Sequence, residues 1–327
     1  MTEVDSVFQK TLKRIGQSEE ETIPVSIFYN LSGPSHSELQ LFEKEWPTIA
    51  LQRRRHIIHS LVEIAELSFE VDFNALFRFC LHDEDAEVRA QAIEGLWEDE
   101  DIALAHVLIQ LLETDASALV REAAAASLGR FVLLVELGKT DRLNIKQVTR
   151  PLLDRIHDPG EGLSVRRRAV ESIAYSGEKV VRGVIEDAYH HEEELMRVSA
   201  VFAMGRSADP YWNKTVLSEL DNSNPAMRYE AARACGELAY ARAVPTLTRL
   251  IDDPDREVQQ VAIWAIAQIG GPEARRVLEE CCSSDDEVIC EAAEEALAEM
   301  ALIGNLDHMP LYDFNDEDFD VDILDLN

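Results

Sequence analysis

Apolar residues recur at every fourth position in a series of short segments, a spacing that places them on one face of an α-helix. The segment DAEVRAQAIEGL (85–96) shows the pattern, and SALVREAAAASLG (117–129) and PAMRYEAARACG (225–236) repeat it. Each has an apolar residue, an Arg next to it, a small apolar residue about four positions on, and often a closing Gly. A second amphipathic stretch, such as DIALAHVLIQLLE (101–113), precedes each marked segment. The pattern predicts units of helix, turn and helix.

These units repeat along most of the chain. The residue after the leading apolar position marks each copy, and the markers are Arg54, Arg89, Arg121, Arg166, Arg197, Arg228, Gln259 and Ile289. Their successive spacings are 35, 32, 45, 31, 31, 31 and 30 residues. One helical pair cannot cover its own apolar face, whereas stacked pairs bury a continuous core. We therefore predict an all-α fold, an α-solenoid of about seven to eight helical hairpins.

The repeat divides the chain into parts. Residues 1–34 do not match the repeat, and they either cap the first hairpin or are mobile. Residues 35–301 form the predicted solenoid, and its long 45-residue spacing reflects an apolar insertion near 130–144. That insertion is either a lengthened second helix packed within the solenoid or an apolar patch for a partner. Residues 302–327 form a tail with eight acids and no Lys or Arg.

Two copies of the repeat resemble a known family. The residues that carry the resemblance are Leu81, Asp83, Val88, Arg89, Ala92 and Leu96 in one copy, and Val120, Arg121, Ala124, Leu128 and Gly129 in the next. The pattern resembles the HEAT repeat, in the short bacterial form of phycobilisome-lyase-like repeat proteins. Such repeats serve many functions, so the resemblance indicates the fold more than the activity.

The resemblance also implies a structural Arg ladder, in which each marker Arg pairs with an Asp of a neighbouring repeat. The ladder residues would be Arg54, Arg89, Arg121, Arg166, Arg197 and Arg228, with Asp85, Asp115, Asp158, Asp221 and Asp253 as partners. The alternative is a row of Arg side chains that binds anions. Periodic acids beside periodic bases favour internal pairing.

Charge narrows the range of partners. The chain has 63 Asp and Glu against 31 Lys and Arg, a formal net charge of -32, which disfavours nucleic acid and anionic membranes as partners. Its five cysteines form no CxxC pair, which disfavours a zinc site or a disulfide framework. We find neither a signal peptide nor a stretch of about 18 apolar residues, so we expect a cytoplasmic protein.

Catalytic motifs are scarce. The sequence has no phosphate-binding Gly-rich loop, G-x-S-x-G or H-E-x-x-H, and His56 and His59 lack nearby acids that would complete a metal site. Deoxyhypusine hydroxylase is a HEAT-repeat enzyme whose di-iron site uses His-Glu pairs, and the matching positions here hold other residues, such as Val198-Ser199 and Tyr229-Glu230. We therefore predict no catalytic residue, cofactor or metal.

A binding surface is the remaining prediction. In HEAT solenoids the second helices line the concave side, and positions +2 and +6 from the leading apolar residue point away from the core stripe. These positions hold Ala90/Glu94, Glu122/Ala126, Arg167/Glu171, Val198/Phe202, Tyr229/Arg233, Gln260/Trp264 and Cys290/Glu294. We predict a protein-binding face formed by Arg167, Val198, Phe202, Tyr229, Arg233 and Trp264. The alternative is that Phe202 and Trp264 pack against neighbouring helices.

The acidic tail also contains apolar anchors. They are Leu311, Tyr312, Phe314, Phe319, Ile323 and Leu324. Such interleaving indicates a docking segment for a partner or a strip that folds back on the solenoid, and the third possibility is a terminus without a role.

Taken together, the sequence favours a non-enzymatic scaffold or adaptor of the bacterial cytoplasm that binds protein partners. The alternative is a lyase-like or chaperone-like accessory that acts on a cofactor-bearing protein. The identity of the partner and the oligomeric state stay open.

Overall fold

The computed structural model describes residues 6–17 and 23–306 of the chain. Within these ranges every regular element is helical, with 18 α-helices and four short 3₁₀ helices. The chain divides into two compact units, residues 1–212 and 213–327. The predicted all-α solenoid of helical hairpins is confirmed, and the described residues form eight hairpins.

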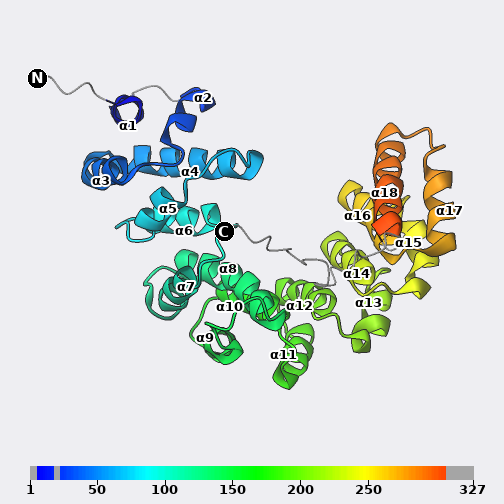
Figure 1. Ribbon diagram of the computed structural model, residues 1–327. Helices are drawn as coiled ribbons and strands as arrows, with labels where there is room; N and C mark the ends of the chain where they lie inside the picture. The colour runs from blue at the N-terminus through cyan, green and yellow to red at the C-terminus, as the bar shows by residue number, and fades with distance from the viewer. Residues whose placement is uncertain (1–5, 18–22, 307–327) are drawn as a thin grey trace, which may run out of the picture. The chain divides into compact units, whose positions relative to one another are not determined.

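In unit 1 the hairpins stack side by side (Figure 1). The first helices are α3 (His36–Glu45), α5 (Asn74–Cys80), α7 (Ile102–Thr114), α9 (Ile145–His157) and α11 (Lys179–Tyr189). The second helices are α4 (Leu51–Leu67), α6 (Ala86–Gly95), α8 (Ala118–Glu136), α10 (Leu163–Ile173) and α12 (Glu194–Arg206). Each second helix contacts the next one along the chain, so they form a continuous row. We call it the second-helix row of unit 1.

Unit 2 repeats the arrangement with three hairpins. Its helices are α13 (Asn213–Glu219), α14 (Pro225–Glu237), α15 (Val244–Leu250), α16 (Arg256–Ile269), α17 (Gly271–Cys281) and α18 (Glu287–Leu306). Helix α16 contacts both α14 and α18, and α15 contacts α17. The last helix runs to Leu306, so the expected boundary at residue 302 falls inside it. Residues 307–327, which include all six predicted tail anchors, lie outside the described residues.

The N-terminal segment covers the first hairpin of unit 1. Helix α1 (Val7–Gln17) contacts α3 and α4, and it is followed by the short helices α2 (Val25–Phe28) and η1 (Tyr29–Leu31). Phe8, Leu12 and Ile15 of α1 are buried. Of the two alternatives for this segment, the described part acts as a cap.

Acidic and amide side chains start many of the helices. Asp85, Asp101, Asn144, Asn224 and Asp255 each accept a hydrogen bond from a backbone N–H in the first turn of the helix that follows. An N-cap of this kind stabilises a helix by about 1 kcal/mol because it satisfies an otherwise unpaired donor. The Asp- and Asn-rich turns of the sequence therefore set where the helices begin.

Two of the closing glycines allow helices to approach closely. A Cβ added to Gly95 in α6 would lie 2.5 Å from the ring of Phe77 in α5. A Cβ added to Gly236 in α14 would lie 2.9 Å from the Cα of Ala265 in α16. These separations are shorter than van der Waals contact, so a larger residue would push the helices apart.

The insertion near 130–144 lengthens α8, which continues to Glu136. Phe131 and Val132 are fully buried within the unit, as a lengthened helix packed in the solenoid requires. Leu133 and Leu137 are 37% and 59% exposed, so the same helix also presents apolar surface. The insertion is thus a lengthened helix packed within the solenoid, and the use of its exposed apolar surface by a partner stays a prediction.

Candidate functional site

Four marker Arg side chains reach acids that precede the next second helix. Arg89 holds Asp115 through two bonds of 2.9 Å, and Arg228 holds Asp253 through bonds of 2.8 and 2.7 Å. Arg54 donates to Asp83 at 2.9 Å, and Arg121 holds Glu161 through two bonds of 2.8 Å. Each acid is at least nine-tenths buried in its side chain. These pairs join one hairpin to the next.

The identity of several partner acids differs from the prediction. Asp85 pairs with Arg55, Asp158 with Arg155 and Asp221 with Arg249, so none of these three receives a marker Arg. Asp83, Asp115 and Asp253 each lie two residues before a helix N-cap and accept that residue's N–H. This turn points the second carboxylate oxygen at the Arg, whereas Asp85 is itself the cap of α6.

The two remaining marker Arg residues donate to backbone oxygens and, in the described part of the chain, form no ion pair with an acid of the next repeat. Arg166 donates to the carbonyl of Ile156 at 3.0 Å, and Arg197 donates to those of His191 and Glu192. Asn222 stands two residues before the cap Asn224, at the position that Asp83, Asp115 and Asp253 hold in three other repeats, and it makes the same turn. The Arg row therefore fixes local structure, with four ion pairs rather than six.

Hydrogen bonds from these Arg side chains lower the pKa of their partner acids. Burial raises the pKa of Asp253, but the bonds from Arg228 and from the Asp255 N–H outweigh it, so the pKa lies below the usual range. Asp115 follows the same pattern with Arg89. The bonds from Arg121 lower the pKa of Glu161 directly. These acids are therefore charged in the folded protein at neutral pH.

The predicted binding face is only partly exposed. Val198 is only 8% exposed, and Ala90 and Glu171, which hold other predicted outward positions, are buried too. The prediction that these three side chains face outward is therefore wrong. Val198 and Ala90 are short side chains, so the larger side chains around them on the second-helix row cover them. Glu171 is held inside by hydrogen bonds from Ser199 and Arg168.

The other five residues of that face are intermediate in exposure and belong to both units. Arg167 donates to Ser199 at 2.9 Å, and Phe202 lies under the Arg206 guanidinium. In unit 2, Arg233 pairs with Glu237 on its own helix. The ring of Trp264 lies against Gly236, so it packs on the neighbouring helix, as the alternative stated. The structure describes each unit by itself and does not bring these residues into one site.

A hollow lies on the second-helix row of unit 1, beside α6 and α8. It has a volume of about 650 Å³, and we call it the α6–α8 groove. Three large apolar side chains line it: Trp97 is 42%, Leu119 47% and Leu133 37% exposed. Tyr175, which follows α10, and Ala126 of α8 complete its apolar wall. This is an accessible apolar surface within a strongly acidic chain.

Charged side chains border the groove. Glu66, Glu94 and Glu122 come from α4, α6 and α8, three successive members of the row. Arg168 of α10 pairs with Glu171, and at 3.5 Å with Glu122. Arg130 of α8 donates to the carbonyl of Trp97, and burial lowers its pKa to about 10. An apolar floor with charged edges is the usual anatomy of a protein-binding site.

Sequence reasoning found part of this groove. Glu94, Glu122 and Ala126 were among the expected outward positions, and Leu133 belongs to the insertion that was proposed as an apolar patch. Trp97 follows the end of α6, and Leu119 precedes the leading apolar residue Val120, so the +2 and +6 rule covers neither. For the apolar part of the groove, the signal in the sequence is the unusually apolar segment after the closing Gly129.

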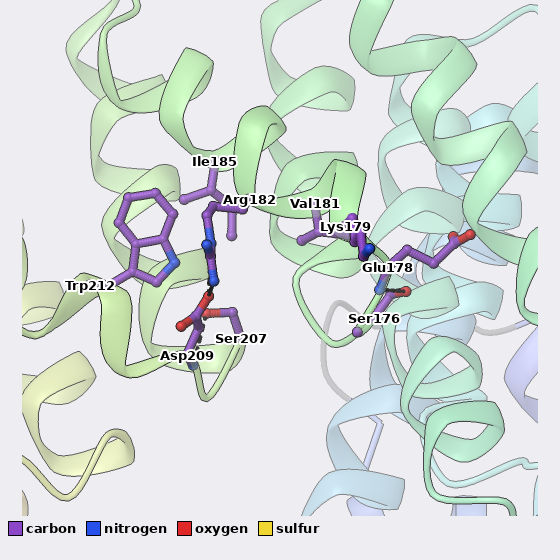
Figure 2. Close-up of a pocket in the computed structure, with 10 residues that line it drawn as sticks. Ser176, Glu178, Lys179, Val181, Arg182, Ile185, Ser207, Asp209 and Trp212 are labelled. Atoms are coloured by element: carbon purple, nitrogen blue, oxygen red, sulfur yellow. Dashed lines mark hydrogen bonds and ion pairs between the residues drawn. The ribbon is translucent and has the colours of Figure 1, made fainter.

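A second hollow, of about 420 Å³, lies at the start of α11 beside the turn 207–212. Figure 2 shows Arg182 reaching from α11 to Asp209, beside the ring of Trp212. Arg182 donates to one oxygen of Asp209 at 3.0 and 2.6 Å and stacks on Tyr211. Arg182 and Asp209 thus pair with each other, and this hollow is the smaller of the two, so we take the α6–α8 groove as the candidate site.

Metal ligands do not gather in the described ranges: no group of three or more His, Cys, Asp or Glu side chains there could hold a metal ion. His59 contacts Gln91 and Glu63, and all five cysteines are free thiols. None of the helices described here is long and apolar enough to cross a membrane.

Comparison with known proteins gives the family and the fold. HEAT repeats are matched over residues 73–159 and 213–298, just over half of the chain, so the predicted resemblance is confirmed. Deoxyhypusine hydroxylase of Schizosaccharomyces pombe is 29% identical over 119 residues, which are 34% of this chain and 37% of that protein. The CpcE–CpcF complex of phycocyanin lyase from Nostoc shares 16% identity at a TM-score of 0.54, covering 84% of this chain and 99% of that one. At that identity the likeness shows the fold alone.

Proposed function

This chain belongs to the HEAT-repeat family, and we propose that it is a non-enzymatic scaffold or adaptor of the cytoplasm that binds protein partners in the α6–α8 groove. The observation that carries the proposal is the exposure of Trp97, Leu119 and Leu133 along one hollow. Burying a large apolar side chain completely stabilises a complex by about 1.5–3 kcal/mol. Each of these three side chains is less than half exposed, so each contributes less than half of that free energy when a partner covers it.

The groove is also built on rigid elements. Ile93 of α6, which lines the groove, and Leu128 and Val132 of α8 are almost fully buried, which fixes both helices in the unit. A site carried by packed helices needs little ordering when a partner binds, so less of the contact energy is lost. Trp is, in addition, one of the residue types enriched at binding hot spots.

A second candidate function is an accessory role on a cofactor-bearing protein. The shared fold with the phycocyanin lyase complex favours it. That role also requires the chain to bind a protein, so it makes the same use of the groove. A pigment that copurifies with the chain from its own cells would distinguish it from a simple scaffold.

The test compares the groove with an equally apolar surface elsewhere. The double variant Leu119→Gln/Leu133→Gln removes two groove contacts and adds no charge. Its matched control is Val180→Gln/Leu195→Gln, because these residues are 45% and 53% exposed and lie outside the groove. Far-ultraviolet spectra and melting curves establish that both variants fold.

Each immobilised protein is incubated with lysate of its own cells, and retained proteins are measured by quantitative mass spectrometry. We expect at least one protein to be retained by the wild type and the control but to fall about tenfold or more with the groove variant, the effect of about 1.4 kcal/mol. The proposal is wrong if every retained protein binds the groove variant as well as the control.

A further inference from the structure

Three carboxylates face the α6–α8 groove from three different helices, Glu66 of α4, Glu94 of α6 and Glu122 of α8. Glu122 has Arg168 at 3.5 Å, although Arg168 also holds Glu171. Among the described residues no Lys or Arg forms an ion pair with Glu66 or Glu94, and Glu94 accepts a hydrogen bond from Gln91. The groove therefore holds two carboxylates that the folded chain leaves without a basic partner.

The electrostatics of Glu94 show the same imbalance. Loss of water at the groove wall raises the pKa of Glu94, and the charge of Glu66 raises it further; His59 lowers this pKa, and Glu122 raises it by the smallest effect of the four. Like charges close together repel, and a cation placed between them removes that repulsion. This is the reverse of the ladder acids, whose pKa values are lowered by their own Arg partners.

The two basic residues of the groove bind groups other than Glu66 and Glu94. Arg130 donates to the Trp97 carbonyl, and Arg168 pairs with Glu122 and Glu171. A Lys or Arg partner for Glu66 and Glu94 would therefore come from another protein. The apolar side chains of Trp97, Leu119 and Leu133 lie in the same hollow, so the partner must also supply an apolar group.

We propose that the α6–α8 groove receives an amphipathic segment of a partner protein, which inserts a Lys or Arg side chain beside Glu66 and Glu94 and an aliphatic or aromatic side chain against Trp97, Leu119 and Leu133. The proposal rests on the proposed function and adds the chemistry of the partner. The net charge of -32 supports it, because a strongly acidic chain attracts basic partners and accelerates their encounter.

Two synthetic helical peptides of about 14 residues, roughly four turns, test this idea. They share one leucine face, and their other positions hold Lys in one peptide and Glu in the other. Binding is measured by fluorescence anisotropy of the labelled peptide against the full chain. The protein variants are Glu66→Gln/Glu94→Gln and the matched control Glu113→Gln/Glu186→Gln, which removes two exposed acids outside the groove.

We expect the lysine peptide to bind the wild type at least about tenfold more tightly than the glutamate peptide. Glu66→Gln/Glu94→Gln should weaken binding of the lysine peptide by about tenfold. The control, which has the same net charge, should change the affinity by less than about twofold. Equal losses in both variants would mean general attraction to an acidic surface and would overturn the proposal. A glutamate peptide that binds as tightly as the lysine peptide would overturn it as well.

The lysate experiment separates the two proposals. A partner that is lost with Leu119→Gln/Leu133→Gln but kept with Glu66→Gln/Glu94→Gln supports the groove as a binding site and refutes the basic partner. If the leucine variant keeps every partner, the proposed function fails first, and the basic partner fails with it.

Discussion

Replacing Asp253 by Asn tests whether the Arg ladder stabilises unit 2. Asp253 is 4% exposed in its side chain and Arg228 12%, and two bonds of 2.7 and 2.8 Å join them. The substitution keeps the size of the side chain and removes its charge. The amide oxygen can still accept the Asp255 N–H, but an NH₂ group then faces the guanidinium. Both groups are hydrogen-bond donors, so they cannot bond to each other.

The expected loss follows from what Arg228 retains. Breaking a buried ion pair by removing one partner costs about 3–5 kcal/mol. Here Arg228 keeps its bonds to the carbonyls of Asn222 and Ser223 and some access to water, which reduces the cost. We therefore expect Asp253→Asn to lower the free energy of unfolding by about 2–4 kcal/mol.

Asp221→Asn is the matched control, because it makes the same chemical change in the same unit. Asp221 and Arg249 are 71% and 62% exposed and share one bond of 3.1 Å, so the loss should be about 0.5 kcal/mol or less. Urea unfolding of the full chain, followed by far-ultraviolet circular dichroism, gives both values. The reasoning fails if the two variants lose the same free energy.

Two further predictions concern packing and pH. Gly95→Ala should lower the free energy of unfolding by about 1–3 kcal/mol, because the buried Phe77 ring occupies the space of the added Cβ. Gly183→Ala in α11 should raise it by up to about 1 kcal/mol, because nothing lies within 4 Å of the added Cβ. Thermal melting of the two variants distinguishes these outcomes. The lowered pKa values of Asp115 and Asp253 stabilise the folded protein at pH values above the pKa of an unfolded Asp, about 3.9. The urea midpoint should therefore fall as the pH drops below about 4. Asp253→Asn should make that fall shallower, and an unchanged dependence on pH would contradict the ladder.

The features that could be predicted are those fixed by local sequence. The four-residue apolar spacing and the repeated Arg placed the helices, because both depend on contacts within one hairpin or its nearest neighbour. The partner acids were harder to predict. Arg54 meets Asp83 and Glu84 rather than Asp85, because the turn before α6 uses Asp85 as a cap, and the sequence shows three consecutive acids there.

The groove could not be predicted as a whole because it depends on how neighbouring helices end. Trp97 follows the last residue of α6, and Leu133 lies in the extra turns of α8. Their closeness results from the stacking of two hairpins of unequal length rather than from a spacing in the sequence. The outward rule also failed at Val198, because it counts angles around one helix and ignores the neighbouring helix that covers a short side chain.

The acids of unit 1 therefore fall into two classes that a single substitution can tell apart. Ladder acids such as Asp115 are held by Arg and stabilise the fold as anions, whereas Glu94 in the groove is repelled by Glu66 and Glu122. Its raised pKa means that its charge opposes folding at neutral pH and that the penalty disappears as the pH falls through the folded value.

We therefore expect Glu94→Gln to raise the melting temperature of the chain at pH 7 and to leave it unchanged well below pH 4, where the carboxyl is already neutral. The same variant should weaken binding of the lysine peptide, because it removes one of the two carboxylates that attract the cation. A residue kept for stability would lose both properties on substitution. Glu94 should gain stability while it loses binding, the exchange typical of functional sites, and a lower melting temperature at pH 7 would show that it belongs to the structure instead.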